Sequence, residues 1–193
     1  MGIVLASGSP RRRELLELIG FEGFKIIPDD SEESVPQGLG PELTVSEIAL
    51  QKAKNVSHFC GDDDIIIAAD TLVYIDGRPM GKPKDAADAV SMLRELSGRM
   101  HSVYTGLVLL KGDRHASDVV KTDVFFRDIP DSEIFAYVES GEPLDKAGAY
   151  GAQGRGSVFV ERVEGEFFNV MGLPLCRLSV MLREFGIDMQ ENT

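Results

Sequence analysis

The sequence predicts an α/β protein whose mixed sheet is flanked by helices. In the first half of the chain, segments with helical spacing of apolar residues alternate with strand-like segments. Further on, two long strand-like runs at residues 102–110 and 117–129 are joined by a polar turn containing Gly112. Alternation of strands and helices favours parallel strands, whereas a hairpin adds an antiparallel pair, so the two patterns together indicate a mixed sheet.

The chain is expected to begin with a strand and a helix. Residues 3–6 are strand-like, and residues 11–20 carry leucine and isoleucine at helical spacing. Ser9 has the residue type of an N-cap, and Pro10 has the fixed φ that suits the first helical position. A helix beginning at these two residues therefore follows the first strand.

A polar loop separates two further predicted elements. A short strand is expected at residues 24–28, and residues 29–43 form a loop rich in Gly, Pro and acidic residues, which we interpret as a rim or a lid. Residues 44–59 then have the periodicity of a second helix, with Lys52 within its apolar stripe.

The middle of the chain carries a buried strand, a hairpin turn and a helix. The continuous apolar run at residues 65–69 is typical of a strand that is buried on both faces. The Asp76-Gly77 pair indicates a hairpin turn. Asp85 should cap a helix that ends near Gly98.

Two more helices are predicted toward the end of the chain. One spans residues 131–140 and closes on Gly141, and the last follows Pro174. Residues 188–193 form a polar tail. The pattern shows no internal repeat and no low-complexity linker, so we expect residues 1–193 to form one domain.

Composition and charge restrict the classes of protein to which the chain can belong. Its 193 residues are 43% apolar and 27% charged, which is enough for a sizeable globular core. The longest apolar stretches are far shorter than the ~20 residues of a bilayer-spanning helix, so no membrane association is expected. A formal net charge of −12 would repel a nucleic acid polymer, yet a local basic cluster could still bind a small phosphorylated ligand.

The expected location of the protein is the cytoplasm. The chain opens directly into the first strand, with no basic leader or small-residue cleavage site, which argues against secretion. Its two cysteines, Cys60 and Cys176, do not form a close metal-binding or redox pair, and this suits a reducing compartment.

Three consecutive arginines, Arg11, Arg12 and Arg13, lie in the first turn of the first predicted helix. Positive charge there opposes the helix dipole, and a bound phosphate would relieve the conflict. The alternative is a solvated helix start with the guanidinium groups at the surface. Because successive helical residues point in different directions, at most two of the three should reach one ligand.

Two lysines are further candidates for contacting phosphate. Lys52 lies on the apolar side of its helix, where it either extends to solvent or meets an anion, and the spacing alone favours the first alternative. Lys82 lies between Gly81 and Pro83, which constrain the backbone and can fix the direction of the lysine side chain.

Two acidic residues are candidates for metal or proton chemistry. Asp70 is expected directly after the buried strand and precedes Thr71, a position from which a carboxylate could bind a divalent metal or orient water. The alternative is a turn or capping role, which this segment by itself favours. Glu33 lies in an acidic run at residues 29–33, for which a solvated charge cluster is the alternative.

A glycine-rich segment at residues 141–156 combines conformational freedom with polar side chains. Its five glycines would let the backbone turn tightly or approach a ligand closely. Their spacing matches neither the dinucleotide-binding pattern nor the P-loop pattern, so the segment alone indicates only a flexible loop.

Taken together, these segments resemble the Maf family of nucleoside triphosphate pyrophosphatases over nearly the whole chain. The order and spacing of the motifs carry the resemblance. They are residues 5–16 (LASGSPRRRELL), 68–71 (AADT), 81–83 (GKP), 142–154 (EPLDKAGAYGAQG) and 169–175 (NVMGLPL). The resemblance implies an elongated α/β fold, similar to that of inosine triphosphatases, with a deep cleft between two lobes.

The resemblance also implies roles for individual residues. Asp70 would be the catalytic acid or base, and it is a candidate metal ligand. Arg11, Thr71 and Gln153 would determine substrate choice, and they match the branch of the family that acts on dTTP and UTP. The resemblance favours a phosphate contact for Lys52 over extension to solvent. The pocket residues that it implies are Ser7, Arg12, Glu33, Lys52, Lys82 and Lys146.

The implied activity is hydrolysis of a nucleoside triphosphate, with dTTP and UTP as substrates, to the monophosphate and pyrophosphate. Removal of non-standard nucleotides is a role that would follow from it. A divalent metal cation, Mg²⁺ or Mn²⁺, would bridge phosphate oxygens and carboxylates. Two alternatives stay open, a nucleotide-binding regulator of cell division without turnover and a phosphatase that releases orthophosphate. The oligomeric state also stays open, with a homodimer as one alternative.

Overall fold

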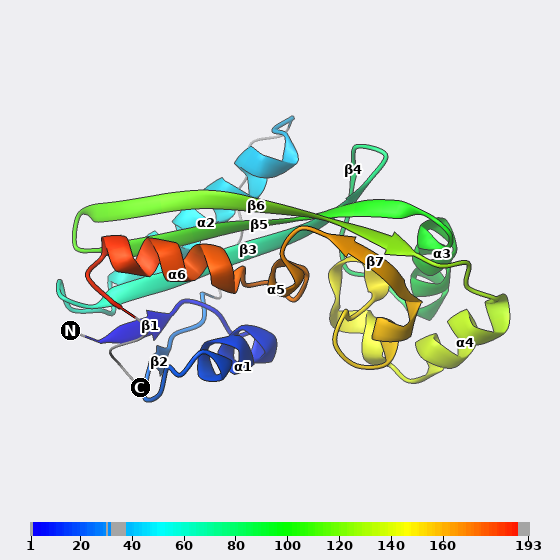
Figure 1. Ribbon diagram of the computed structural model, residues 1–193, viewed down its shortest axis with the longest axis horizontal. Helices are drawn as coiled ribbons and strands as arrows, with labels where there is room; N and C mark the ends of the chain where they lie inside the picture. Colours follow the sequence, from blue (N-terminus) through cyan, green and yellow to red (C-terminus); the bar gives the residue numbers. More distant parts are fainter. Residues whose placement is uncertain (1, 30, 32–37, 189–193) are drawn as a thin grey trace. The chain divides into compact units, whose positions relative to one another are not determined.

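Strands of the described residues, which are 2–29, 31 and 38–188, form one seven-stranded mixed sheet in this computed structural model (Figure 1). The strands are β1 (Ile3–Leu5), β2 (Lys25–Ile26), β3 (Ile65–Ile75), β4 (Arg78–Met80), β5 (Met100–Lys111), β6 (Arg114–Phe126) and β7 (Val160–Glu164). Their order is β2-β1-β3-β5-β6-β7, and β4 pairs with β3. β1 is parallel to β2 and β3, whereas β4 and β7 pair antiparallel with β3 and β6. The predicted mixed α/β class is therefore confirmed.

The helices predicted from the sequence lie close to their expected positions, and one short helix at residues 167–170 was not predicted. Pro10 and Pro41 occupy the first turns of α1 and α2, where a missing N–H costs nothing because that N–H has no helical partner. For this reason α2 begins at Pro41, earlier than the predicted residue 44. The α-helices are α1 (Pro10–Leu18), α2 (Pro41–Ser57), α3 (Ala86–Leu96), α4 (Asp131–Glu139), α5 (Phe167–Val170) and α6 (Leu175–Glu184).

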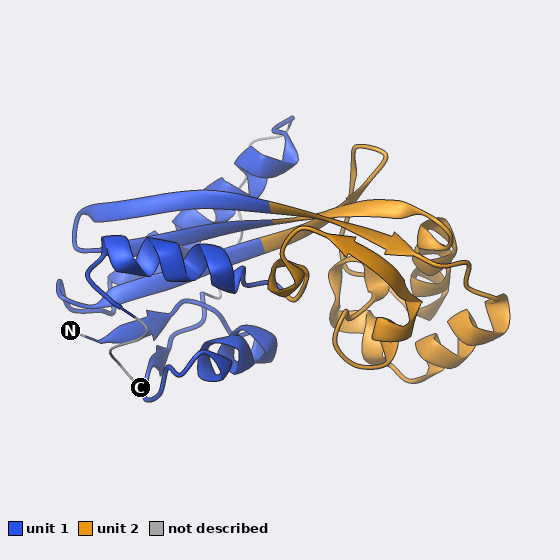
Figure 2. Ribbon diagram, viewed as in Figure 1, with its two compact units in different colours: residues 1–70, 105–120, 172–193 blue, residues 71–104, 121–171 orange. Residues whose placement is uncertain are grey.

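The chain divides into two compact units (Figure 2). Unit 1 comprises the described parts of residues 1–70, 105–120 and 172–193, and unit 2 comprises residues 71–104 and 121–171. The strands β3, β5 and β6 each contribute residues to both units. No linker marks this division in the sequence, because three of the points of division fall inside these strands. The cleft implied by the family resemblance stays a prediction.

The core of unit 1 forms where α2 packs on the sheet. Ala49, Ala53 and Val56 of α2 are buried in one cluster with residues of β1, β3 and β5. Gly106 of β5 permits this packing, because a Cβ atom there would lie only 2.3 Å from the carbonyl oxygen of Val45. In Figure 1, α2 passes behind the strands of this unit and α6 passes in front of them.

The core of unit 2 contains an aromatic cluster and a buried histidine. The rings of Phe126 and Tyr150 meet edge to face with centroids 4.7 Å apart, and His101 packs against both. The ring nitrogen Nε2 of His101 lies 2.8 Å from the Tyr150 hydroxyl. This contact satisfies both polar groups, which are almost completely removed from solvent.

Two sequence-based expectations are wrong in detail. Asp70 does not follow a strand end, because β3 continues to Ile75. Beyond Asp70 the burial pattern changes from continuous to alternating, which still forms a strand but with one face less buried. The glycine-rich segment is not a flexible loop, since it folds into the 3-10 helices η1 (Glu142–Asp145), η2 (Ala147–Ala149) and η3 (Arg155–Phe159).

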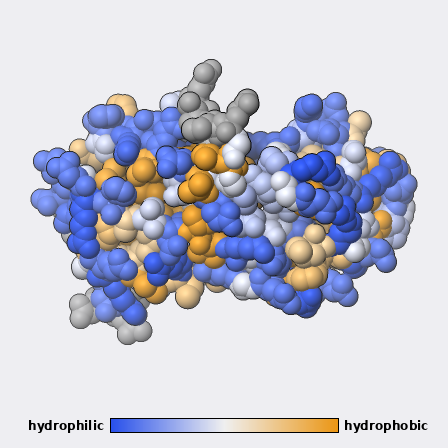
Figure 3. Space-filling model, turned by 90° about the horizontal axis from the view of Figure 1, so that it is seen from above, coloured by the Kyte–Doolittle hydropathy of each residue, from blue (hydrophilic) through white to orange (hydrophobic). Residues whose placement is uncertain are grey.

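Large hydrophobic residues are mostly buried, and the face shown in Figure 3 is predominantly hydrophilic, with hydrophobic side chains in limited areas. Among the described residues, no helix is long and apolar enough to cross a membrane. This agrees with the short apolar stretches of the sequence.

Candidate functional site

The loop between β1 and α1 holds Ser7 and Arg12 together. The Ser7 hydroxyl accepts hydrogen bonds from the Ser9 N–H and from Nη1 of Arg12, both at 3.2 Å. Nε of Arg12 donates to the carbonyl oxygen of Gly172 at 2.7 Å. These contacts fix the guanidinium group beside Ser7, which is itself buried. A fixed guanidinium next to a hydroxyl and the start of a helix is an arrangement that can bind a phosphate group.

Two of the three consecutive arginines, Arg12 and Arg13, point in different directions, as their helical spacing predicts. Arg13 turns along the exposed surface of α1, where its Nε donates to Glu17 at 2.8 Å. Arg12 instead turns toward Ser7 and Gly172. Arg11 is half-buried at the same helix start. Arg13 therefore has a structural partner on its own helix, whereas Arg12 lies at the predicted anion site.

Lys52 of α2 and Asp70 of β3 form an ion pair, with Nζ of the lysine 2.7 Å from Oδ1 of the aspartate. Both side chains are mostly buried, with 15% and 11% of their surface exposed. Lys52 thus meets an anion, and the extension to solvent that its spacing alone favours is not found. Asp70 lies within a strand, so the turn or capping role is not found either. A mostly buried ion pair of this kind holds both side chains in a defined place.

Asp29 is a neighbour of this pair that the sequence pattern did not single out. Partial burial by itself would raise its pKa, but hydrogen bonds from Ser31 and Asn55, with the positive charge of Lys52, lower the pKa below its ordinary value. Nδ2 of Asn55 lies 3.1 Å from Oδ2 of Asp29. Asn55 follows Lys52 by three positions and so shares its helix face, which is the one signal that the sequence offered. The carboxylates of Asp29 and Asp70 therefore both interact with Lys52.

The oxygen donors at this place suit a hard divalent cation. Mg²⁺ and Mn²⁺ prefer carboxylate oxygens, and Mg²⁺ is commonly held by one or two carboxylates together with substrate phosphates. Asp70 and Asp29 provide such carboxylates. The part of the chain that the structure describes contains no group of three or more His, Cys, Asp or Glu side chains arranged to hold a metal by themselves. Glu33, the other acidic candidate, lies outside the described residues.

The remaining candidate residues belong to unit 2. Lys82 is exposed, and its segment is attached to the glycine-rich segment because the Gly148 N–H donates to the Gly81 carbonyl oxygen at 3.1 Å. Lys146 is mostly buried, with its Nζ 2.5 Å from the carbonyl oxygen of Glu142 and 2.6 Å from Oδ1 of Asp145.

Thr71 and Gln153 differ in exposure. Thr71 is half-buried in β3, next to Asp70, and Gln153 is exposed on the turn between η2 and η3. The structure therefore brings the candidates into two groups. In unit 1 these are Ser7, Arg11, Arg12, Lys52 and Asp70, and in unit 2 they are Thr71, Lys82, Lys146 and Gln153.

The fold and these side chains define a mixed α/β protein in which basic groups accompany a mostly buried aspartate, Asp70, that pairs with Lys52. A family model described as Maf-like protein matches residues 2–185. The chain belongs to this family, and the resemblance drawn from its motifs is confirmed.

Individual relatives agree with this assignment. A dTTP/UTP pyrophosphatase from Caldicellulosiruptor bescii is 44% identical over 194 residues, which cover 98% of this chain and 97% of that protein. A protein of the same name from Bacillus cereus is 46% identical over 187 residues, covering 97% of each chain. The structure of a HAM1 protein from Coxiella burnetii superimposes with a TM-score of 0.54 at 19% identity, over 95% of this chain and 99% of that chain, which shows a similar fold.

Proposed function

We propose that the protein hydrolyses nucleoside triphosphates, with dTTP and UTP as its preferred substrates, to the monophosphate and pyrophosphate. The observation that carries this proposal is the similarity of at least 44% identity to proteins named dTTP/UTP pyrophosphatase over 97% or more of the chain. The ion pair of Lys52 and Asp70 supports it, because it holds a charged carboxylate next to a cation in a mostly buried place.

The basic side chains would neutralise the triphosphate. Arg12 and Ser7 present a guanidinium and a hydroxyl at the start of α1, and Lys52, Lys82 and Arg11 add positive charge. Water attacks the α-phosphorus, the new bond forms from the water oxygen, and the bond from the α-phosphorus to the bridging oxygen breaks. Pyrophosphate leaves with the electron pair of that bond, and one proton of the water is released. Positive charge near the leaving oxygen stabilises the charge that develops there.

Asp70 has two compatible roles in this reaction. Its carboxylate either accepts the proton of the attacking water or holds a divalent cation, and in each role the ion pair with Lys52 fixes the position of the carboxylate. We propose Mg²⁺ or Mn²⁺ as the cation, held by Asp70 and Asp29 together with phosphate oxygens. Such a cation supplies further positive charge to the triphosphate when bound.

Base selection is proposed for the unit 2 residues. Uracil and thymine present two carbonyl acceptors on either side of one N–H donor, and the amide of Gln153 offers one donor and one acceptor to that edge. Thr71, half-buried beside Asp70, adds a hydroxyl. Removal of non-standard pyrimidine nucleotides would follow from this selection. We also propose the cytoplasm as the location, because the sequence has only two cysteines, Cys60 and Cys176, and no close cysteine pair, which suits a reducing compartment.

Product analysis tests the proposal against its two alternatives. Purified protein would be incubated with a panel of normal and modified nucleoside triphosphates, with Mg²⁺, with Mn²⁺ and with a chelator. Pyrophosphate released from UTP and dTTP in amounts equal to the monophosphate supports the proposal. Release of orthophosphate would instead indicate a phosphatase, and binding without turnover would indicate a regulator. Equal rates with and without the chelator would contradict the proposed role of a cation.

A further inference from the structure

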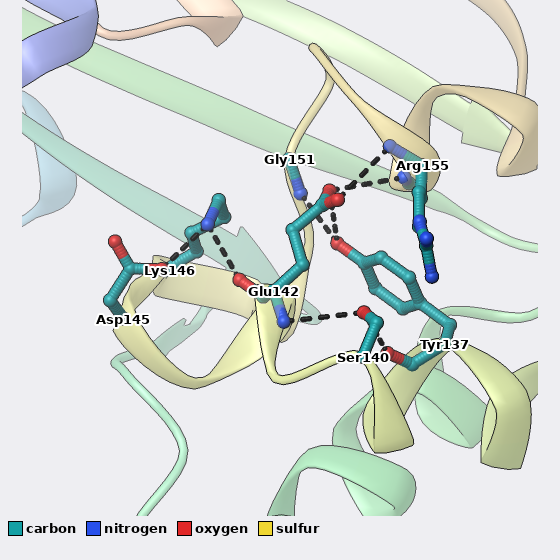
Figure 4. Close-up of polar contacts among 8 residues, drawn as sticks. Tyr137, Ser140, Glu142, Asp145, Lys146, Gly151 and Arg155 are labelled. Carbon is teal, nitrogen blue, oxygen red and sulfur yellow. Dashed lines mark hydrogen bonds and ion pairs between the residues drawn. The ribbon is translucent and has the colours of Figure 1, made fainter.

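The carboxylate of Glu142 binds three donors from the segment around it (Figure 4). Its Oε1 accepts from the Tyr137 hydroxyl at 3.0 Å and from the Gly156 N–H at 3.3 Å. Its Oε2 accepts from the Arg155 N–H at 3.1 Å. A charged acceptor that binds backbone N–H groups in this way makes stronger hydrogen bonds than a neutral one. Glu142 therefore fixes the chain immediately after Gln153 and Gly154.

The same carboxylate also fixes the chain before Gln153, through Tyr137. The Tyr137 hydroxyl accepts from the Gly151 N–H at 3.1 Å while it donates to Glu142 (Figure 4). Burial and the Glu142 carboxylate raise the pKa of the Tyr137 hydroxyl above its ordinary value, so the hydroxyl stays protonated and can donate. Both ends of the turn that carries Gln153 are thus attached to one carboxylate.

The glycines of this turn make the attachment sterically possible. A Cβ atom on Gly154 would lie 3.0 Å from Oε1 of Glu142, and one on Gly156 would lie 2.8 Å from the Tyr137 hydroxyl oxygen. Gly154 also has a φ of 95°, which side-chain-bearing residues rarely adopt. The glycines that suggested a flexible loop therefore let the backbone close around the half-buried carboxylate of Glu142, whose hydrogen bonds hold the turn in place.

We infer that Glu142 is a positioning residue for pyrimidine recognition, acting through Gln153 without touching the nucleotide itself. The inference rests on the proposed function and names a residue that decides its specificity. A turn that is already ordered does not have to be ordered when the base binds, so its contacts with the base are stronger. The backbone carbonyl of Glu142, which contacts Lys146, does not depend on the side chain. Loss of the carboxylate should therefore affect contacts with the base and spare contacts with phosphate.

The test compares Glu142→Gln with Tyr137→Phe and with the control Glu139→Gln. Glu142→Gln keeps the shape and one acceptor oxygen but places an amide N–H₂ opposite a backbone donor. Tyr137→Phe removes the hydroxyl that joins Glu142 to Gly151. Glu139 is an exposed residue at the end of α4, so its substitution removes a carboxylate of the same unit without touching the turn. Wild type, these three variants and the double variant Glu142→Gln/Tyr137→Phe would be assayed for KM and kcat with UTP and dTTP, and for inhibition by inorganic tripolyphosphate, which has no base.

We expect both test variants to raise KM for UTP and dTTP by ~10-fold with kcat within about twofold of wild type, because binding of the base is lost. The inhibition constant of tripolyphosphate and all constants of Glu139→Gln should stay at wild-type values. The KM values of the double variant should be little higher than those of either single variant, since both substitutions disrupt the same hydrogen-bond network. The inference would be overturned by unchanged KM values in Glu142→Gln, or by an inhibition constant of tripolyphosphate that rises as much as KM does. Either result would leave the pyrophosphatase assignment intact. Absence of pyrophosphate release by wild-type protein would overturn both.

Discussion

Nζ of Lys52 and Oδ1 of Asp70 lie 2.7 Å apart in an ion pair that is mostly removed from solvent. The lysine comes from a helix, α2, and the aspartate from a strand, β3, so the pair depends on the packing of that helix on the sheet. Lys52 interacts electrostatically with a second carboxylate, that of Asp29. Partial burial opposes ionisation of Asp29, but hydrogen bonds from Ser31 and Asn55, together with the charge of Lys52, lower the pKa of Asp29 below its ordinary value.

We predict that Asp70→Asn keeps the fold and most of the nucleotide affinity but lowers kcat for UTP by ~100-fold or more. The amide removes the negative charge that either accepts a proton or binds a cation, and Lys52 keeps an oxygen acceptor near its Nζ. Steady-state kinetics, nucleotide titration and circular dichroism measure the three quantities. Asp62→Asn, at an exposed residue of the turn before β3, serves as the control. Near-normal turnover in Asp70→Asn would show that the carboxylate has only a structural role.

Lys82→Ala should weaken the binding of UTP much more than the binding of uridine. The proposed partner of Lys82 is a phosphate group, and the nucleoside has none. A factor of ~10 or more in the Kd of UTP is expected for a lost contact with a charged group. Lys84→Ala is a matched control, because Lys84 is an exposed lysine of the same segment. Equal losses for UTP and uridine would place Lys82 away from the phosphates.

The sequence predicted most elements but not those that depend on distant contacts. The strand β7 was missed because Val160–Glu164 contains three charged residues, and its pairing with β6 supplies the reason for it to be a strand. Part of β3 was missed because Asp70 and Thr71 interrupt an apolar run. Hydrophobic periodicity reports local burial, and it does not report backbone pairing between strands that are far apart in the sequence.

Prediction of the candidate site from the sequence was limited in the same way, because its contacts join residues that are far apart in the chain. Helical spacing singled out Lys52 and the end of an apolar run singled out Asp70, but neither pattern gave a reason to place the two side chains in contact. The ordered conformation of the glycine-rich segment was also not predictable, since it depends on hydrogen bonds that the Glu142 carboxylate accepts from residues 137, 155 and 156. Glycine allows many backbone conformations, and only the tertiary contacts select one of them.

The buried His101 should make the stability of the protein depend on pH. Burial lowers the pKa of His101 from its ordinary value of 6.5 to about 4, despite an opposing effect of Asp123. Between these two values the unfolded chain binds a proton that the folded protein does not bind. Stability therefore rises with pH in this window and is lost as the pH falls through it, by ~2 kcal/mol between pH 7 and pH 5.

Urea unfolding at pH 7 and pH 5 measures this contribution. His101→Phe should be less stable than wild type at pH 7, because the Tyr150 hydroxyl loses its partner. Its further loss of stability at pH 5 should be smaller than that of wild type by ~2 kcal/mol. His115→Gln, at an exposed histidine of β6, should retain the full pH dependence. The same dependence in His101→Phe as in wild type would contradict the assignment to His101.

Gln153 provides the most direct test of base selection. Wild-type protein should hydrolyse UTP and dTTP faster than GTP and ATP, because a site that binds one base edge penalises bases that leave its polar groups unpaired. Gln153→Glu removes the amide donor and adds a negative charge, so we expect kcat/KM for UTP to fall by ~10-fold or more. Inhibition by pyrophosphate should change less, since pyrophosphate has no base. The UTP-to-GTP ratio of kcat/KM, measured for both proteins, isolates the base contact. A wild-type preference for purine triphosphates, or an unchanged ratio in Gln153→Glu, would refute pyrimidine selection by this residue even if pyrophosphate is released.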